Sequence, residues 1–368
     1  MEELAEDDIL ELGVSFLEIL GENMRPPSKK LYLWRLFNIV SLIIPTSYTI
    51  LSFKQASGDE YIQTIEGACI LIHILVKYLV LIFYKSSIKE LLDARSKFWK
   101  FERFGNEASQ AKAVFKQVKL VQLIMTISVT FVIIMFWLRP YLEANMRFIL
   151  ACWIYPDSVV LEALVLACQY YVLGSALSIV LGYDYVYFAY VVHVTLQMRL
   201  LNYRLRTISV KTTMEELREC LQFHCFLLSL FKNINAVYFW MFLFHYVVTL
   251  GTGCTELYIV LTGKVDIREI VASMFYNMSL LIQFGYYAFP ADILASEFRE
   301  ASDAIYASSW YKQDIKVQKV LLFTMVRAQR QKYMIAGGIV EMNADSFSSV
   351  IRKTFSFYAL SKNVLNKE

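Results

Sequence analysis

Several patterns that would indicate an enzyme or a soluble domain are missing from this sequence. Charged residues make up only 19% of the 368 residues. There is no glycine-rich phosphate loop, no His-x-x-His arrangement and no nucleophile beside a base. The six cysteines have no metal-ligand spacing, and the first 30 residues begin with acidic residues instead of a basic segment followed by an apolar run. We therefore expect no enzyme activity, metal, cofactor or cleaved signal peptide.

Apolar residues, in contrast, are abundant. They make up 57% of the chain, against about 45–50% in a typical soluble domain, and the mean hydropathy is +0.45. The net charge of +3 gives no support for nucleic-acid binding. Because a helix needs about 20 mostly apolar residues to cross a bilayer, we predict an all-α integral membrane protein with seven transmembrane helices. The predicted spans are 31–53, 62–84, 118–138, 163–192, 230–260, 267–293 and 346–363.

Lysine and arginine are distributed unequally between the two sides of these spans. With the N-terminus in the cytoplasm, the inner segments hold about 23 Lys and Arg residues and the outer segments about seven. This bias predicts a cytoplasmic N-terminus and an extracellular C-terminus. G-protein-coupled receptors have the opposite orientation, and their Asp/Glu-Arg-Tyr and Asn-Pro-x-x-Tyr motifs are missing here.

Long polar-flanked segments at 85–117, 194–229 and 294–345 are expected to be helices that continue past the inner membrane surface. In the last of them an apolar stripe recurs at helical spacing, with basic residues around it. The stripe fits a helix on the bilayer surface or, as its narrow width favours, a subunit interface. Its residues are Val317, Val320, Leu321, Thr324 and Ala328. The expected regions are 1–293 (membrane region with a pocket and intracellular helix extensions), 294–345 (intracellular inter-subunit anchor) and 346–368 (last span and extracellular C-terminus).

The last span has an unusual polar face. Gly337-Gly338 interrupts the preceding helical pattern, and Asp345 or Ser346 is positioned to cap the new helix. Because hydroxyls and a cation are not placed against lipid, this face either packs among neighbouring helices or lines a pore. In the second case, its two outer apolar residues would form a hydrophobic gate. The face consists of Ser349, Lys353, Ser356, Leu360 and Val364.

Several segments near the C-terminus together resemble the insect odorant receptor family. They are 304–311 (AIYASSWY), 318–319 (QK), 321–329 (LLFTMVRAQ), 336–338 (AGG) and 347–358 (FSSVIRKTFSFY). The gustatory-receptor signature of Thr-Tyr followed by Gln-Phe is not present in the last span, although Thr354-Phe355 comes close to it.

The resemblance implies an odorant-binding subunit of a ligand-gated, non-selective cation channel. Such a subunit would form a heterotetramer with the shared odorant receptor coreceptor, with the last span of each subunit lining the pore. The partners would be a small neutral volatile, the bilayer, and permeant monovalent and divalent cations. The location would be the plasma membrane of an olfactory sensory neuron dendrite. The chain resembles a tuning subunit, because 194–229 is too short for the coreceptor's intracellular segment.

In that topology the outer halves of the second to sixth spans would enclose an aromatic, nearly uncharged pocket. The alternative for each candidate is ordinary core packing or a place in the interfacial aromatic belt. The candidates are Thr64, Gly67 and Leu71 in the second span, Thr130, Ile133, Ile134 and Trp137 in the third, Tyr170, Tyr171, Gly174 and Ser178 in the fourth, and Phe275, Tyr276 and Ser279 in the sixth.

Asp184 is the deepest ionisable residue in the spans, and we expect it to bind tyrosine hydroxyls or a cation from a neighbouring helix. The lone histidines His73 and His245 are expected to be core groups. Cys152 and Cys168 either form a disulfide near the outer face or are small apolar fillers. A gustatory-like receptor channel and a secondary transporter stay open as other functions, although the internal repeat of many transporters is not found.

Overall fold

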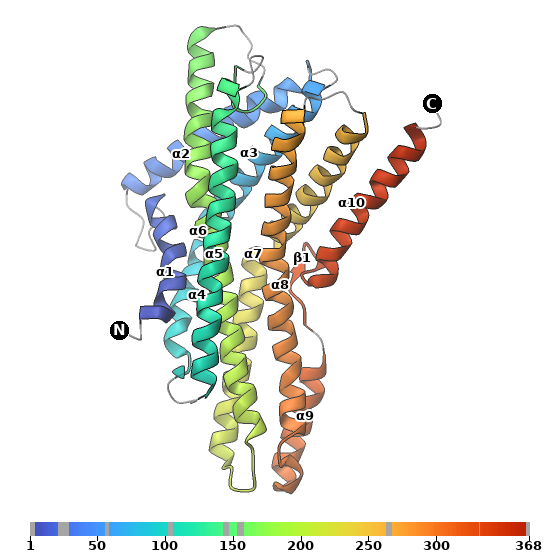
Figure 1. Cartoon of the computed structure of the whole chain (residues 1–368). Coiled ribbons are helices and arrows are strands. Elements are labelled where there is room, and N and C mark those ends of the chain that lie inside the picture. Colours follow the sequence, from blue (N-terminus) through green and yellow to red (C-terminus); the bar gives the residue numbers. More distant parts are fainter. Residues whose placement is uncertain are drawn as a thin grey trace.

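The computed structural model describes residues 4–20, 29–55, 59–101, 106–142, 147–152, 158–262, 267–330 and 332–365. This part of the chain is a bundle of long helices, with one short hairpin (Figure 1). The elements are α1 (Leu4–Ile19), α2 (Lys29–Ser52), α3 (Asp59–Phe83), α4 (Lys85–Ala94), η1 (Arg95–Lys97), α5 (Asn106–Leu142), α6 (Val159–Arg206), α7 (Met214–Thr262), α8 (Ile267–Tyr306), η3 (Trp310–Lys312), α9 (Ile315–Gln329), β1 (Ile335–Ala336), β2 (Val340–Glu341) and α10 (Ala344–Leu365).

Each of the seven predicted spans coincides with a helix: α2, α3, α5, α6, α7, α8 and α10. Among the described residues, five of these helices are long and apolar enough to cross a membrane by length and composition: α2, α3, α5, α6 and α7. The helices α8 and α10 occupy the positions of the sixth and seventh predicted spans. The all-α architecture predicted from hydropathy is therefore confirmed.

The long helix α6 forms the centre of the bundle and contacts α1, α2, α3, α5, α7 and α8. Every side chain from Leu181 to Met198 is buried. Along this stretch α6 is therefore surrounded by other helices on all sides. It holds the inner and outer parts of the bundle together.

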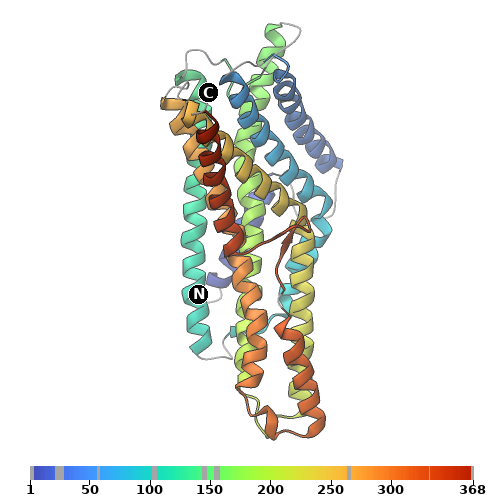
Figure 2. The same cartoon turned by 90° about the vertical axis from the view of Figure 1, so that its right-hand side faces the viewer.

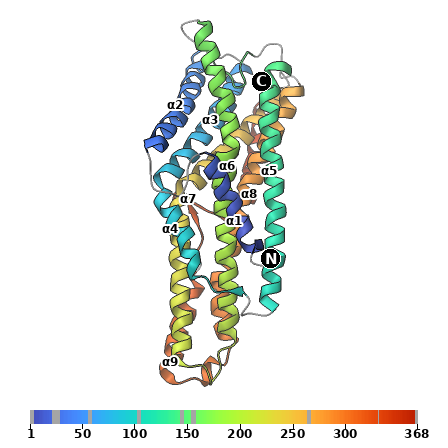
Figure 3. The same cartoon turned by 90° about the vertical axis from the view of Figure 1, so that its left-hand side faces the viewer.

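The first helix, α1, was not predicted from the sequence. It lies against the middle of α6 (Figure 3) and buries Ile9, Leu10 and Leu17. Glycines at the contact permit the close approach: a Cβ on Gly13 would lie 2.9 Å from the backbone nitrogen of Val186. The acidic composition of the first residues concealed this apolar face.

The expected helical extensions are present at the end of the bundle where α6 ends and α7 begins. There α9 packs alongside α8 (Figure 2) and buries one face against the chain itself. Three residues of the predicted interface stripe, Val317, Leu321 and Ala328, are buried within the chain, while Val320 is partly exposed. Thr324 is half-buried and donates to the carbonyl of Val320. The other apolar residues that α9 leaves exposed are Ile315, Leu322, Phe323 and Val326.

Between α9 and α10 the chain forms the hairpin β1–β2, which the sequence did not predict. The predicted break at the glycine pair is its turn, since Gly337 and Gly338 have φ values of 57° and 77°. The cap prediction for α10 needs correction: Asn343 is the N-cap, and its Oδ1 accepts from the backbone nitrogen of Ser346 at 2.8 Å. Ser346 reciprocates by accepting from the backbone nitrogen of Asn343 at 3.3 Å, a capping-box arrangement.

Candidate ligand-binding cavity

A cavity of about 80 Å³ lies between α3, α5, α6 and α8. It is in the half of the bundle that contains the end of α5 and the beginnings of α6 and α8, at the top of Figure 1. Most of the lining side chains are apolar and buried. They are Ile70, His73, Ile74, Val129, Val132, Ile133, Phe136, Leu173, Ala176, Val180, Tyr276, Ser279, Leu280 and Gln283.

A buried polar network adjoins one end of the cavity, here called its floor, and reaches the lining through Gln283. The ammonium of Lys77 lies 2.7 and 2.9 Å from the two carboxylate oxygens of Asp184, and both side chains are fully buried. The Tyr287 hydroxyl also donates to Asp184, as does the side-chain amide of Gln283, which lines the cavity. The prediction that Asp184 binds a tyrosine hydroxyl or a cation from another helix is confirmed on both counts.

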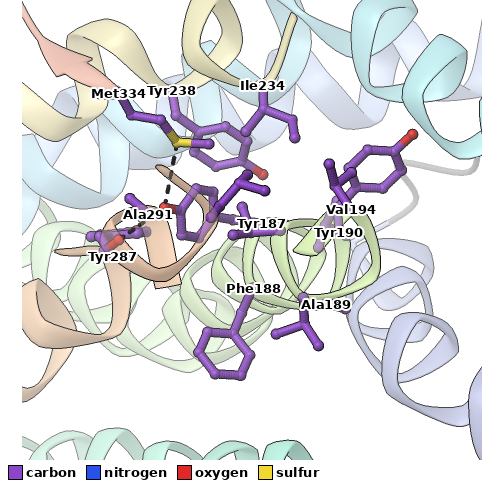
Figure 4. Close-up of a cluster of buried hydrophobic side chains, with 14 of the residues drawn as sticks. Tyr187, Phe188, Ala189, Tyr190, Val194, Ile234, Tyr238, Tyr287, Ala291 and Met334 are labelled. Carbon is purple, nitrogen blue, oxygen red and sulfur yellow. Dashed lines mark hydrogen bonds between the residues drawn. The ribbon is translucent and has the colours of Figure 1, made fainter. Parts of the chain in front are cut away.

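Next to this network, a cluster of tyrosines leads towards the hairpin. The ring of Tyr187 lies 4.8 Å from that of Tyr238 and 5.3 Å from that of Tyr287 (Figure 4). The Tyr187 hydroxyl donates to the backbone oxygen of Tyr287 at 2.9 Å and lies 3.7 Å from the sulfur of Met334. Since Met334 directly precedes β1, the cavity floor is connected to the segment before α10.

Two polar side chains of the cavity have buried atoms without a hydrogen-bond partner in the described part of the chain. These atoms are the Nε2 of His73 and the hydroxyl oxygen of Tyr276. His73 lies beside His245, with ring centroids 5.1 Å apart, and Tyr276 meets Phe136 edge-on at 6.1 Å. Both side chains can donate or accept a hydrogen bond. The sequence did not indicate that His73 would line a cavity.

The candidate residues from the sequence and the lining of this cavity lie on the same four helices, α3, α5, α6 and α8, whereas α7, the fifth predicted span, contributes no lining residue. Ile133, Tyr276 and Ser279 line the cavity. The remaining candidates lie around it: Thr64, Leu71 and Ser178 are buried nearby, and Ile134, Trp137 and Phe275 are more than a third exposed. Gly174 and Tyr170 contact Trp137, Gly67 lies near Leu150, Tyr171 donates to Asn38, and Thr130 is half-buried.

The difference is mainly one of helix rotation. On α5 the lining residues are each one position earlier than the candidates: the candidates are Thr130, Ile133, Ile134 and Trp137, and the lining residues are Val129, Val132, Ile133 and Phe136. A shift of one residue corresponds to about 100° around a helix of 3.6 residues per turn. Lipid is as apolar as a side-chain core, so hydropathy cannot show which apolar face points inwards.

A larger groove of about 770 Å³ lies between α5, α6, α8 and α10. Several of the side chains that line it are apolar and exposed, including Ile124, Met278 and Ile282. Only a small part of its surface is polar, and Arg199, at one end, is paired with Glu297 at 2.6 Å. We prefer the smaller cavity as the ligand site, because most of its lining is buried within the bundle, whereas several side chains that line the groove are exposed.

The helix α10 packs on α7 and α8. Of the predicted polar face, Ser349 is half-buried, Lys353 and Ser356 are exposed, and Leu360 is 62% exposed. Lys353 donates to the Tyr246 hydroxyl at 2.8 Å, and Ser356 donates to the backbone oxygen of Arg352. The side chain of Val364 is outside the described residues. Most of this face is thus not covered by the chain itself.

No disulfide joins Cys152 and Cys168, and all six cysteines are free.

The comparisons with known proteins agree with this architecture. The model of the 7tm Odorant receptor family matches residues 58–355. Odorant receptor Or2 of Anopheles gambiae is 23% identical over 158 residues, which cover 43% of this chain and 42% of that protein. Odorant receptor 19a of Drosophila melanogaster is 23% identical over 137 residues, or 37% of this chain and 35% of that protein. The matches thus span about two-fifths of the length of these curated relatives.

Solved structures show the same fold over nearly the whole chain. The insect olfactory receptor OR5 from Machilis hrabei in complex with eugenol superposes with a TM-score of 0.87 and 14% identity, covering 99% of this chain and 100% of that one. Another structure of OR5 has a TM-score of 0.80 and 13% identity, covering 90% of this chain and 89% of that one. With the family model matching most of its length, this chain belongs to the insect 7tm odorant receptor family, whose members are membrane receptors and not enzymes.

Proposed function

We propose that this receptor is the odorant-binding subunit of a ligand-gated, non-selective cation channel. It acts as a heterotetramer with the odorant receptor coreceptor in the plasma membrane of an olfactory sensory neuron dendrite. The N-terminus is cytoplasmic and the C-terminus extracellular, as the distribution of lysine and arginine indicates. The observation that carries the proposal is the position of α8. This helix lines the apolar cavity and also packs against α10, which has an exposed polar face.

The cavity is suited to a small neutral molecule. Its walls offer dispersion contacts, its lining among the described residues has no charged side chain, and the adjoining charges of Lys77 and Asp184 neutralise each other. An engineered cavity of about 150 Å³ holds benzene, so a volatile must widen the 80 Å³ cavity when it binds. Ligand binding therefore has to displace side chains or helices around the cavity.

The helix α8 offers a direct connection from the cavity to α10. Tyr276 and Gln283 line the cavity, and the next aromatic residue, Phe284, stacks on Phe347 of α10 with centroids 6.2 Å apart. Phe289 lies 5.0 Å from the same ring. Displacement of α8 by a ligand is thereby transmitted to the base of α10, whose exposed face lines the pore. Leu360 and Val364 form the gate at its outer end.

Subunit contacts at the inner end come from the face of α9 that the chain itself leaves uncovered. Leu322, Phe323 and Val326 are exposed there. In contrast, Val317, Leu321 and Ala328 of the apolar stripe predicted from the sequence are buried by contacts within the chain. Monovalent and divalent cations pass along the axis between the four subunits. Anchoring at the inner end leaves the outer ends of α10 free to separate.

The test is whole-cell current during application of mixed volatiles, with this chain alone, the coreceptor alone, and both expressed together. A response that needs both chains, with an odorant preference different from that of the coreceptor alone, supports the proposal. Equal responses with and without this chain contradict it and favour a gustatory-like receptor channel or a secondary transporter, whose substrate uptake would then be measured.

A further inference from the structure

The polar atoms of the cavity fall into two groups. The amide nitrogen of Gln283 is engaged by Asp184, and the Ser279 hydroxyl lies 3.4 Å from that of Ser128. The Nε2 of His73 and the Tyr276 hydroxyl, in contrast, are buried and have no hydrogen-bond partner among the described residues. Buried polar groups in folded proteins are nearly always hydrogen-bonded, so these two atoms leave two hydrogen-bonding positions in the cavity open to a bound molecule.

The two unpartnered side chains, His73 and Tyr276, lie at different levels of the cavity. His73 precedes Lys77 by one helical turn on α3 and is therefore close to the polar floor. Tyr276 precedes Gln283 by seven residues on α8, which places it about 10 Å nearer the outer end. Apolar side chains, including Ile133, Leu173 and Ala176, fill the walls between them. A molecule in the cavity can bind a polar group at either end while its apolar body contacts these walls.

We propose, building on the function above, that this receptor selects neutral volatiles that carry a hydrogen-bonding oxygen, such as alcohols, phenols, ketones and esters, over hydrocarbons of the same shape. The oxygen binds His73 or Tyr276, each of which can donate to it. Ions are excluded because the cavity presents no unpaired charge: the carboxylate of Asp184 and the ammonium of Lys77 bind each other.

The test uses matched ligand pairs of equal size, 2-phenylethanol with propylbenzene and 1-hexanol with heptane. Affinity is measured on the purified heteromer by displacement of a fluorescent apolar probe, and currents are recorded separately. The variants are Tyr276→Phe, which removes only the hydroxyl, and His73→Phe. The control is Tyr286→Phe, because Tyr286 is on the same helix and also has a buried, unpartnered hydroxyl, but it lines the larger groove and not this cavity.

We expect the oxygenated member of at least one pair to bind about tenfold more tightly, as one buried hydrogen bond predicts. Tyr276→Phe or His73→Phe should abolish this preference without weakening hydrocarbon binding, and Tyr286→Phe should preserve it. Equal affinity within both pairs, no binding by any member, or a preference that survives both cavity variants would overturn the inference. A preference in binding without any current would instead overturn the channel function and leave the inference standing.

Discussion

Asp184 accepts hydrogen bonds from three side chains, Lys77 on α3 and Gln283 and Tyr287 on α8, and is itself at the centre of α6. Removing two charges from water is costly, and the pair is stable only because the additional hydrogen bonds satisfy the carboxylate. The network thus fixes the relative positions of three helices that surround the cavity. Its contribution is to specify the arrangement of the bundle more than to add net stability.

Replacing one partner of the pair should be far more harmful than replacing both. Asp184→Asn leaves the Lys77 ammonium buried without a counter-charge, which we expect to cost about 3–5 kcal/mol. The double variant Lys77→Met/Asp184→Asn removes both charges and should recover most of the loss. The measurement is the fraction of receptor that stays monodisperse after heating, followed by fluorescence-detected size-exclusion chromatography. A double variant no more stable than Asp184→Asn would show that the pairing of charges is not what matters.

At this scale the sequence predicted two kinds of partner for Asp184, a tyrosine hydroxyl and a cation, but not the amide of Gln283 or the full lining of the cavity. A buried charge must find a counter-charge or donors, so its environment follows from general rules. Ile133 and Tyr276 were identified because aromatic and aliphatic residues are common in such cavities. His73 was taken for a core group, since a single histidine in an apolar helix carries no signal that a ligand is nearby. Its missing hydrogen bond is visible only in the structure.

Among the helices, the contact between α7 and α10 is close at one glycine. A Cβ on Gly253 would lie 3.1 Å from the methyl group of Thr354 and 3.2 Å from its hydroxyl. Two residues earlier in the chain, on about the opposite side of the helix, Gly251 has no atom within 4 Å of such a Cβ. The two positions therefore form a matched pair on the same helix, and only one of them touches α10.

Gly253→Ala should displace α10 by a few tenths of an ångström and change the resting current or the ligand concentration for half-maximal response in the heteromer. Gly251→Ala should leave both unchanged and stabilise α7 slightly, by about 0.5–1 kcal/mol, because alanine favours a helix more than glycine does. The two variants are compared by patch-clamp recording at equal surface expression. Identical currents from Gly253→Ala and the wild-type receptor would argue against a role of α10 in gating.

The hairpin before α10 offers a second matched pair. Gly337 has a φ of 57°, and a Cβ there would lie 2.8 Å from Cγ of Leu243, whereas the nearest atom to a Cβ on Gly338 is 3.8 Å away. Both alanine substitutions meet the unfavourable backbone conformation, but only Gly337→Ala adds a collision with α7. We expect much lower surface expression for Gly337→Ala than for Gly338→Ala, measured by labelling intact cells. Equal expression would mean that the hairpin does not depend on its contact with Leu243.

The long helices were predictable because each contains an apolar run of membrane-spanning length. The short elements were not. The helix α1 begins with acidic residues, and its fit against α6 depends on Gly13 and Gly182, which come from distant parts of the sequence. The strands β1 and β2 have two residues each and are held by α7 through Asn235 and Phe239. Such elements form because of tertiary contacts, not local propensity.

For the whole molecule, the family and the membrane class follow from the C-terminal segments and from hydropathy. The assembly with a coreceptor, the pore and the ligand class depend on surfaces that a single chain leaves open, and they stay proposals. The bundle places the cavity beside α8 and α8 against α10, so that a ligand a few residues from Phe284 acts on the helix proposed to line the pore. The larger groove between α5 and α8 is the competing site.

The most direct test of this account compares a substitution in each of the two sites by recording dose–response curves from the heteromer. Ala176→Leu adds three heavy atoms to the small cavity, and Ile282→Phe enlarges a side chain in the larger groove. With surface expression matched, we predict that Ala176→Leu raises the half-maximal ligand concentration about tenfold or more, while Ile282→Phe changes it less than about twofold. The reverse pattern would place the ligand in the groove and contradict the account.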